Sequence, residues 1–305
     1  MGDLDQAALT ERVLRLGNLS PWNRLTTAEL DLIASAGREV VAATRTLLVP
    51  AEERSSALFV ALSGRLRAVR NGQPVPGDPV RAFYGGASLL GDSVISADVV
   101  AEPGTVLYVL DRDTFFSVLE EHGALQRSLL RVMSRQVIDM RGEEIVTSGA
   151  AAGPQPAALS SADLLSRMRI LRETLGLEWH SLPVIAQLAR AALVRRTKPG
   201  GVIWQKANGP ASVVVVLEGA VDVLRPGVVT KRVRPGEGVG MVEALAGTPI
   251  AYEGVAATDT LTVEVTAAEL QEAIEDHDDF CQDLVRVVAL ELNSRTFKGL
   301  VGAHA

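Results

Sequence analysis

The chain has 305 residues, which is enough for two domains of ordinary size with a core each. Hydrophobic residues make up 47% of it, which excludes a disordered protein, and a net charge of -7 disfavours nonspecific attraction to nucleic acid or anionic lipid. Because aromatic residues are only 4%, we expect the cores to consist of Val, Leu, Ile and Ala.

The compartment is also indicated by the sequence. The single cysteine, Cys281, has no partner for an internal disulfide, and its apolar neighbours predict a packing role. The start of the chain carries acids and no apolar run, so it does not resemble a secretory signal, and Gln6 stands where a myristoylation site needs Ser or Thr. No segment approaches the ~18 apolar residues of a membrane span. We therefore predict a cytoplasmic protein without a membrane span.

In the first half, the sequence predicts a helix, several short strands and two more helices. Thr26 with Glu29 predicts the start of the first helix. The turn pairs Ser63-Gly64, Asn71-Gly72 and Pro103-Gly104 separate the strands. Asp111 to Asp113 predict the cap of a helix that ends near Gly123, where a longer helix begins. The predicted strands are residues 46–49, 58–62, 66–69, 99–101 and 106–110.

The second half repeats this order. Its predicted strands are residues 202–204, 213–217, 220–224 and 261–265. Thr266 predicts the cap of the helix that follows them, and a final helix carries Phe280 and Leu292. Small residues and two prolines between the halves predict a tether. The expected organisation is a first domain at 1–146, a linker at 147–160 and a second domain at 161–305.

The two halves match at a constant offset of 155 residues. Turn glycines and apolar positions keep register, for example Gly64 with Gly219 and Ile95 with Ile250. A duplicated domain explains this agreement far better than chance. The apolar stripe of residues 129–137 is expected to pack on its own domain, and the alternative is that part of it joins the other repeat or a second subunit.

Residues 198–205 and 213–223 resemble the cyclic-nucleotide-binding domain family: a Pro-Gly turn and a strand are followed by an apolar strand that ends in Glu-Gly. Residues 57–66 carry the equivalent pattern in the first half. The resemblance covers roughly residues 10–140 and 165–297. It implies a mainly β fold with flanking α-helices, consisting of two tandem jelly-roll-like β-rolls (double-stranded β-helices) of eight strands each, in the order of kinase regulatory subunits.

Binders of this family hold the cyclic phosphate with an arginine and helix amides, and the ribose with a glutamate. A buried phosphodiester needs such donors and a bidentate cation. In this sequence Gly86 and Met241 stand at the glutamate positions, and Ile95 and Ile250 at the arginine positions. Bound cyclic nucleotide is therefore the expectation of the family and not of this sequence, and no cofactor is predicted.

The alternative is a pocket for a different ligand, because Gly85, Gly86 and Gly240 still allow a ligand to approach the backbone closely. A further alternative is that Arg81, Lys231, Arg232 or Arg234 replaces the missing arginine, although a solvated strand face is the simpler reading for them. The candidate pocket residues are Gly85, Gly86, Ala87, Ser88, Ile95, Ser96, Gly240, Met241, Val242, Glu243, Ile250 and Ala251. Glu243 would repel a phosphate if it faced this pocket.

The sequence offers no active site. His122 and His277 follow equivalent acidic helix ends and are expected to cap them, and the acids around His277 point in different directions, so no metal site is predicted. Only eight residues follow Phe297, which leaves no room for a helix-turn-helix, so direct DNA binding is not expected.

Two functional hypotheses remain. In the first, the chain is a noncatalytic regulatory or adaptor protein that works through an unknown protein partner, with a homo-oligomer through its terminal helices as a further possibility. In the second, it is a small-molecule receptor that binds a cyclic nucleotide or another ligand in a noncanonical pocket and relays binding through the terminal helices.

Overall fold

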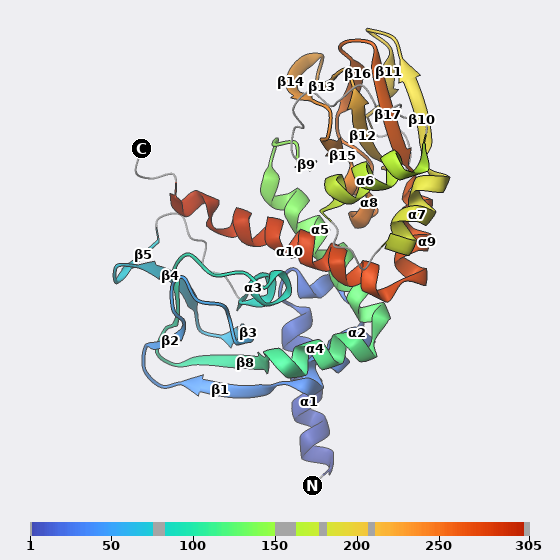
Figure 1. The fold of residues 1–305 in the computed structure, drawn as a ribbon. Helices are drawn as coiled ribbons and strands as arrows, with labels where there is room; N and C mark the ends of the chain where they lie inside the picture. Colours follow the sequence, from blue (N-terminus) through green and yellow to red (C-terminus); the bar gives the residue numbers. More distant parts are fainter. Residues whose placement is uncertain (1, 76–82, 150–162, 177–181, 207–210, 302–305) are drawn as a thin grey trace. The chain divides into compact units, whose positions relative to one another are not determined.

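The computed structural model describes residues 2–75, 83–149, 163–176, 182–206 and 211–301 (Figure 1). It contains two compact units. The first unit consists of Met1–Gln136 and Val285–Ala305, and the second unit consists of Val137–Leu284. Each unit therefore contains one sequence repeat together with part of a long helix from the other repeat.

The first repeat folds as an antiparallel β-roll with helices around it. Its sheets have the strand orders β1-β8-β3-β6 and β2-β7-β4-β5. The elements are α1 (Gly2–Gly17), the 3-10 helix η1 (Trp22–Arg24), α2 (Thr27–Ala36), β1 (Arg38–Ala42), β2 (Thr46–Val49), β3 (Ala57–Ser63), β4 (Leu66–Arg70), β5 (Gln73–Pro74), β6 (Phe83–Tyr84), α3 (Gly86–Gly91), β7 (Asp98–Ala101), β8 (Thr105–Asp111), α4 (Arg112–Glu121) and α5 (Gly123–Arg141).

The second repeat has the same plan, with strand orders β10-β17-β12-β15-β9 and β11-β16-β13-β14. The elements are β9 (Thr147–Ser148), α6 (Leu164–Leu175), α7 (Leu182–Ala191), β10 (Leu193–Thr197), β11 (Val202–Trp204), β12 (Val213–Glu218), β13 (Val221–Arg225), β14 (Val228–Val233), β15 (Gly238–Val239), α8 (Met241–Ala246), β16 (Glu253–Ala256), β17 (Thr260–Val265), α9 (Ala267–Asp276) and α10 (Asp278–Val301).

These elements confirm the predicted fold of two β-rolls with flanking helices, although the described helices contain more residues than the strands do. The repeat also holds in three dimensions. The pairs β1 and β10, α3 and α8, β7 and β16, and α4 and α9 each begin and end 155 residues apart. Strands β3 and β12 bury every side chain over residues 57–61 and 213–217, so the cores are mainly aliphatic, as the composition predicts. The edge strands β1 and β10 expose most of their side chains.

Local signals in the sequence fix several element ends. Thr26 begins α2 with a capping box in which the Thr26 hydroxyl accepts from the amide of Glu29 and the Glu29 carboxylate accepts from the amide of Thr26. Asn71 and Gly72 both have positive φ angles, of 52° and 78°, as a tight hairpin turn between β4 and β5 requires. His122 and His277 occupy the C-cap positions of α4 and α9, as predicted.

Two sequence-based boundaries differ from the structure. Thr147 and Ser148, which were expected to begin the linker, form strand β9 and pair with β15 of the second roll. The long helices also do not end with their repeats: α5 continues from the first unit into the second at Val137, and α10 continues from the second unit into the first at Val285. Of the apolar stripe at residues 129–137, only the last residue, Val137, falls in the second unit. The core of the predicted linker, residues 150–160, lies outside the described residues.

Cys281, the single cysteine, is buried, consistent with its predicted packing role. Among the helices in the described ranges, we find none with the length and apolar character needed to cross a membrane.

The repeats provide a matched test of helix capping. Thr266 begins α9 with a full capping box to Glu269, whereas the equivalent Asp111 begins α4 without a side-chain cap hydrogen bond. We expect Thr266→Ala to lower the free energy of unfolding by about 1 kcal/mol, because an orphan amide at the helix end loses its acceptor. Asp111→Ala is expected to cost less than half of that. Calorimetric unfolding of the full chain measures both; equal losses would contradict this account.

Candidate functional site

Five of the six candidate residues from the first repeat come together at the start of α3. They line one small cavity of about 30 Å³ within the first unit. The sixth, Ser96, is not among the lining residues; its carbonyl accepts a hydrogen bond of 2.9 Å from Arg70, and its hydroxyl is buried without a partner in the described part of the chain. The lining candidates are Gly85, Gly86, Ala87, Ser88 and Ile95.

Gly85 serves the turn that leads into α3. Its φ angle is 95°, and a Cβ atom built at this position would lie 2.4 Å from the carbonyl oxygen of Ala57. Gly240 repeats this arrangement, with a φ angle of 88° and a Cβ position 2.1 Å from the carbonyl oxygen of Ser212. Both glycines are therefore required by backbone conformation and close packing on the adjoining strand, whether or not a ligand binds.

Ser88 and Ile95 are both engaged by the protein itself. The Ser88 hydroxyl donates to the carbonyl of Ser93 and accepts from the amide of Ser55 at 3.4 Å. Ile95 is only 1% exposed and belongs to the apolar interior of the β-roll with Phe59, Tyr84 and Leu107 among other side chains. The family's arginine position is thus part of the hydrophobic core.

Helix α10 covers the same cavity, a role that sequence reasoning missed. Leu292, Asn293 and Thr296 line it together with Gln136 of α5. The Asn293 side-chain amide donates to the hydroxyl of Ser93 at 2.9 Å and to the carbonyl of Val94 at 3.0 Å. The helix backbone also approaches closely, because a Cβ atom on Gly91 would lie 3.2 Å from the amide nitrogen of Leu290. The only signal in the sequence was the apolar stripe of the terminal helices.

In the second unit the candidate residues lie on or beside α8. Met241, Val242 and Ile250 are buried, and the Cδ1 atom of Ile250 lies 3.3 Å from the Cβ position of Gly240. Ala251 is exposed at the surface of the following loop. The apolar residues at the family's anchor positions are therefore packed as core side chains in this repeat too.

Glu243 does not face a pocket as a free charge. It is 1% exposed and forms an ion pair with Arg141 at the end of α5, in which Nη1 and Oε1 are 2.6 Å apart. The hydroxyl of Tyr252 donates to the same oxygen at 3.1 Å. The expected repulsion of a phosphate by Glu243 is replaced by neutralisation within the chain.

The ion pair belongs to a larger polar and aromatic cluster around Tyr252. The guanidinium carbons of Arg141 and Arg225 lie 5.9 and 5.8 Å from the centre of its ring, and Trp204 packs edge-on against it at 6.4 Å. Burial, and then the charge of Glu243, raise the pKa of Tyr252 well above its usual value. Sequence reasoning missed this cluster because its members come from five separate segments.

Two of the four basic residues considered as replacements for the missing arginine are engaged elsewhere. Lys231 donates to the Thr147 hydroxyl at 2.9 Å, and Arg232 forms a bidentate pair with Asp222 at 2.7 and 2.9 Å. Arg81 lies outside the described residues.

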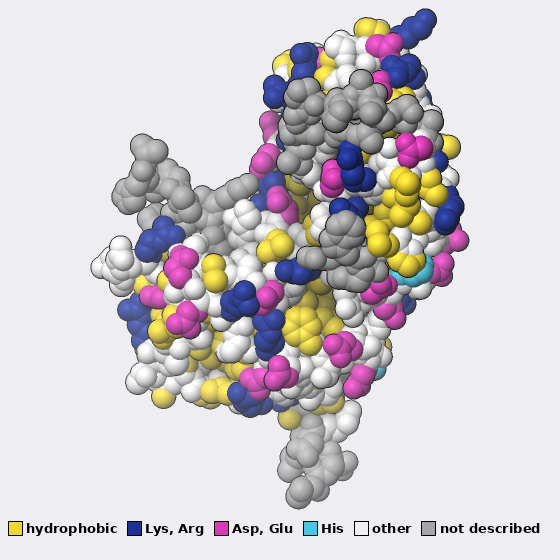
Figure 2. Space-filling model, in the orientation of Figure 1, with side chains coloured by type: hydrophobic (Ala, Val, Ile, Leu, Met, Phe, Trp, Pro, Cys, Tyr) yellow, Lys and Arg dark blue, Asp and Glu magenta, His cyan; other side chains and the backbone are white. Residues whose placement is uncertain are grey.

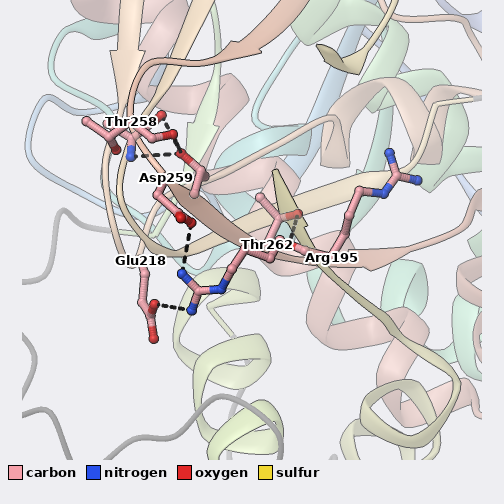
Figure 3. A network of polar contacts seen from close by, with 8 residues as sticks. Arg195, Glu218, Thr258, Asp259 and Thr262 are labelled. Atoms are coloured by element: carbon pink, nitrogen blue, oxygen red, sulfur yellow. Dashed lines mark hydrogen bonds and ion pairs between the residues drawn. The ribbon is translucent and has the colours of Figure 1, made fainter. Parts of the chain in front are cut away.

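Surface charges near β10 form a structural network. Figure 3 shows the carboxylates of Glu218 and Asp259, which accept hydrogen bonds of 2.7 and 2.9 Å from Arg196. On the face seen in Figure 2, basic and acidic side chains are interspersed. A search of the described part of the chain for three or more grouped metal-ligating side chains finds none.

Comparison with known proteins places residues 194–277 within the pattern of the cyclic nucleotide-binding domain family. This match confirms the resemblance seen in the sequence, over the second repeat. No curated protein matches the chain.

Solved structures with similar folds include two regulatory subunits. One is the regulatory subunit of a cAMP-independent protein kinase A from Trypanosoma cruzi bound to guanosine, with 19% identity, a TM-score of 0.34, and coverage of 88% of this chain and 86% of that chain. Another is the regulatory domain of Toxoplasma gondii protein kinase A with cAMP, with 17% identity, a TM-score of 0.35, and coverage of 95% and 99%. The ligands named are those of the two relatives.

The buried ion pair predicts a strong asymmetry between breaking and replacing it. Arg141→Met leaves Glu243 buried without a cation, so we expect a loss of about 3–5 kcal/mol in the free energy of unfolding. Combining it with Glu243→Leu is expected to recover most of this loss. The surface variant Arg196→Met is the control and should change the melting temperature little. A single variant as stable as the wild type would show that the pair is not buried in solution.

The buried tyrosines predict a loss of stability in alkali. Burial raises the folded-state pKa of Tyr108 and Tyr252, so their protons are retained in the folded protein while the unfolded chain loses them above about pH 10. Their contribution to stability is complete below that pH and declines above it. We expect the variant with Tyr108→Phe and Tyr252→Phe to lose less stability than the wild type between pH 9 and 11 in urea titrations. Equal pH slopes would contradict the prediction.

Proposed function

We propose that this protein is a noncatalytic regulatory or adaptor protein whose two cyclic-nucleotide-binding-like repeats no longer hold a cyclic nucleotide and which acts through protein–protein contacts. The observation that supports the proposal is that the apolar residues at the family's arginine positions, Ile95 and Ile250, are buried within the chain. In the first unit Ile95 lies in the apolar core and α10 covers the cavity at α3. The sequence predicts no bound cofactor, and this packing supports that prediction without testing it.

Size supports the proposal for the first repeat. The cavity of about 30 Å³ is a small fraction of the roughly 300 Å³ at which ligand pockets for molecules of this class begin. A nucleotide would have to displace Leu292 and break both hydrogen bonds of Asn293. Binding would therefore oppose packing that the folded chain already has.

Charge supports it for both repeats. A hydrogen bond to a charged group contributes ~1.5–3 kcal/mol, and each 1.4 kcal/mol is about tenfold in affinity. The loss of the arginine and the glutamate together thus weakens binding by roughly three orders of magnitude. In the second repeat the buried cation Arg141 lies beside α8 and is already paired with Glu243.

Calorimetric titration with cAMP, cGMP and cyclic dinucleotides tests the proposal. We expect no saturable heat below millimolar concentration with the full chain, because Ile95 and Ile250 provide no cation for the phosphate at the two anchor positions. Matched variants restore the family's anchors: Gly86→Glu with Ile95→Arg in the first repeat, and Met241→Glu with Ile250→Arg in the second. Saturable micromolar binding to the unaltered chain would overturn the proposal, whatever the variants do.

The protein partner is the second half of the proposal. We expect the full chain to bind its partner equally well with and without millimolar cyclic nucleotide. The reason is that no nucleotide is expected to bind at the family's arginine and glutamate positions, so none would change the conformation of the chain. Light scattering of the purified chain distinguishes a homo-oligomer from a monomer that binds another protein. A partner that dissociates only on addition of cyclic nucleotide would favour the receptor hypothesis.

The alternative, a receptor for another small molecule, is supported by one observation. The cavity at α3 is lined by both long helices, α5 through Gln136 and α10 through Asn293, and each of these helices continues into the second unit. A ligand that moved them would change both units. The cytoplasmic location of the protein stays a prediction from the sequence.

A further inference from the structure

Exposed apolar side chains gather on the outer strands of the two rolls. Six of the thirteen large apolar side chains that are exposed in the described part of the chain lie on β1, β2, β10 and β11, each of which stands at one end of its sheet. Strands β1 and β10 expose four of their five residues each. An outer strand with exposed apolar side chains favours pairing with a further strand, so these edges are candidates for an interface. The six side chains are Val40, Val41, Leu47, Leu193, Val194 and Val202.

Most outer strands of the rolls are protected against such pairing. Strands β6 and β9 have two residues each, and β5 contains Pro74, which has no N–H group. Register shifts interrupt the pairing of β2, β11 and β14 with their neighbours. By contrast, β1 pairs with β8 and β10 pairs with β17 over five residues without a shift, and neither strand contains proline or lysine. Within the described ranges, β1 and β10 are therefore the two regular edges.

The outer side of β1 carries the backbone groups of Glu39 and Val41. The carbonyl of Ala42 accepts a hydrogen bond of 2.7 Å from the amide of Gly104, the residue before β8, so the backbone groups of Ala42 face β8. Successive residues of an antiparallel strand direct their backbone groups to opposite sides. The groups of Glu39 and Val41 therefore point away from β8.

The outer side of β10 carries the backbone groups of Val194 and Arg196. The hydroxyl of Thr262 in β17 donates to the carbonyl of Arg195 at 3.4 Å, so Arg195 faces β17 (Figure 3). Val194 and Arg196 then direct their N–H and C=O groups away from β17. The two edges pair with their neighbours in equivalent registers, 155 residues apart, so their outward residues correspond.

These outward groups match one another when β1 is aligned antiparallel to β10 of a second copy. Complete overlap of the two five-residue strands places Glu39 opposite Arg196 and Val41 opposite Val194. Each of the two pairs can exchange two backbone hydrogen bonds. One pair joins opposite charges and the other joins apolar side chains, and both kinds of cross-strand pair stabilise a sheet.

The charged side chains are accessible for this contact. Those of Glu39 and Arg196 are 36% and 51% exposed, although each already has an ion-pair partner within the chain. Pairing of like edges offers no such match. Complete overlap of β10 with a second β10 places Arg195 against Arg195, and overlap of β1 with a second β1 places Glu39 against Val41. Charge complementarity thus favours β1 with β10.

We propose that copies of this chain associate by antiparallel pairing of β1 in one copy with β10 in another, which joins a four-stranded sheet to a five-stranded sheet. Two copies that exchange both edges form a closed dimer, and copies joined by one edge each form an open chain of molecules. The inference goes beyond the proposed function and does not rest on it. A monomeric protein could still lack nucleotide binding, and an associating protein could still bind a nucleotide.

Sedimentation velocity of the full chain at low and high micromolar concentration tests for association. We expect the weight-average mass to rise with concentration from that of one chain, 32.3 kDa, to that of a dimer or a longer assembly. A protein that stays monomeric at every concentration would overturn the proposal.

Two variants separate the edges. Val41→Pro and Val194→Pro each remove one outward N–H group, and an outer strand tolerates this change because its bonds to the neighbouring strand are kept. Either variant alone has lost one of the two edges, so we expect its dissociation constant for self-association to rise about tenfold or more. An equimolar mixture should form a dimer that does not grow further, because the intact β10 of one variant pairs with the intact β1 of the other.

Two control variants should associate like the wild type. Val41→Thr keeps the N–H group and the preference for a strand, and Val228→Lys changes an exposed residue on a different edge, β14. The proposal is overturned by a proline variant that alone associates as tightly as the wild type, or by a mixture that remains monomeric. Loss of association in Val228→Lys would place the contact on another edge and would also count against it.

A second pair of variants keeps the test decisive if circular dichroism shows that the proline variants do not fold. Val41→Lys and Val194→Lys then replace them, with the same expected results alone and in the mixture. Val41 and Val194 are exposed in the single chain, so a charge there is tolerated by the fold and is unfavourable only in the paired sheet.

Discussion

Burying a charge inside a β-roll is unfavourable unless an opposite charge replaces the lost water, and both repeats obey this constraint without a ligand. In the first repeat the interior contains no ionised side chain at the critical position, since Ile95 sits among apolar neighbours. In the second repeat a buried carboxylate is present, and Arg141 neutralises it from α5. The two copies therefore reach the same electrostatic balance by different routes, one by removing charge and one by pairing it.

The long helices link this balance to the architecture. Arg141 stands at the end of a helix that begins in the first unit, and Asn293 stands on a helix that begins in the second. Both side chains form hydrogen bonds with the segment that follows the turn glycine of a roll, Gly240 or Gly85. The family holds its phosphate at this segment. A half chain cut near residue 150 would lack one of these contacts, so experiments on function are best done with the full chain.

The sequence predicted most of the fold because its signals are local or repeated. The alternation of apolar and polar residues, the turn glycines and the caps at Thr26 and Thr266 depend on neighbours within a few residues. Because the two repeats match at an offset of 155 residues, most of these signals occur twice at equivalent positions. Five of the candidate pocket residues also line one cavity near α3, while their role in binding stays a prediction. The pairing of Arg141 with Glu243 and of β9 with β15 joins segments about a hundred residues apart, and neither leaves a periodic trace. Both pairings depend on how the folded chain brings these distant segments together.

The hydrogen bonds of Asn293 to the loop before β7 have a consequence for folding during synthesis of the chain. A ribosome adds about 5–20 residues per second, so roughly 8–30 s separate the emergence of α5 from that of the helix which closes the amino-terminal roll. During that interval the cavity at α3 lacks the side chains that Leu292, Asn293 and Thr296 contribute to its lining. A chaperone could bind this incomplete surface before α10 has been synthesised and covers it.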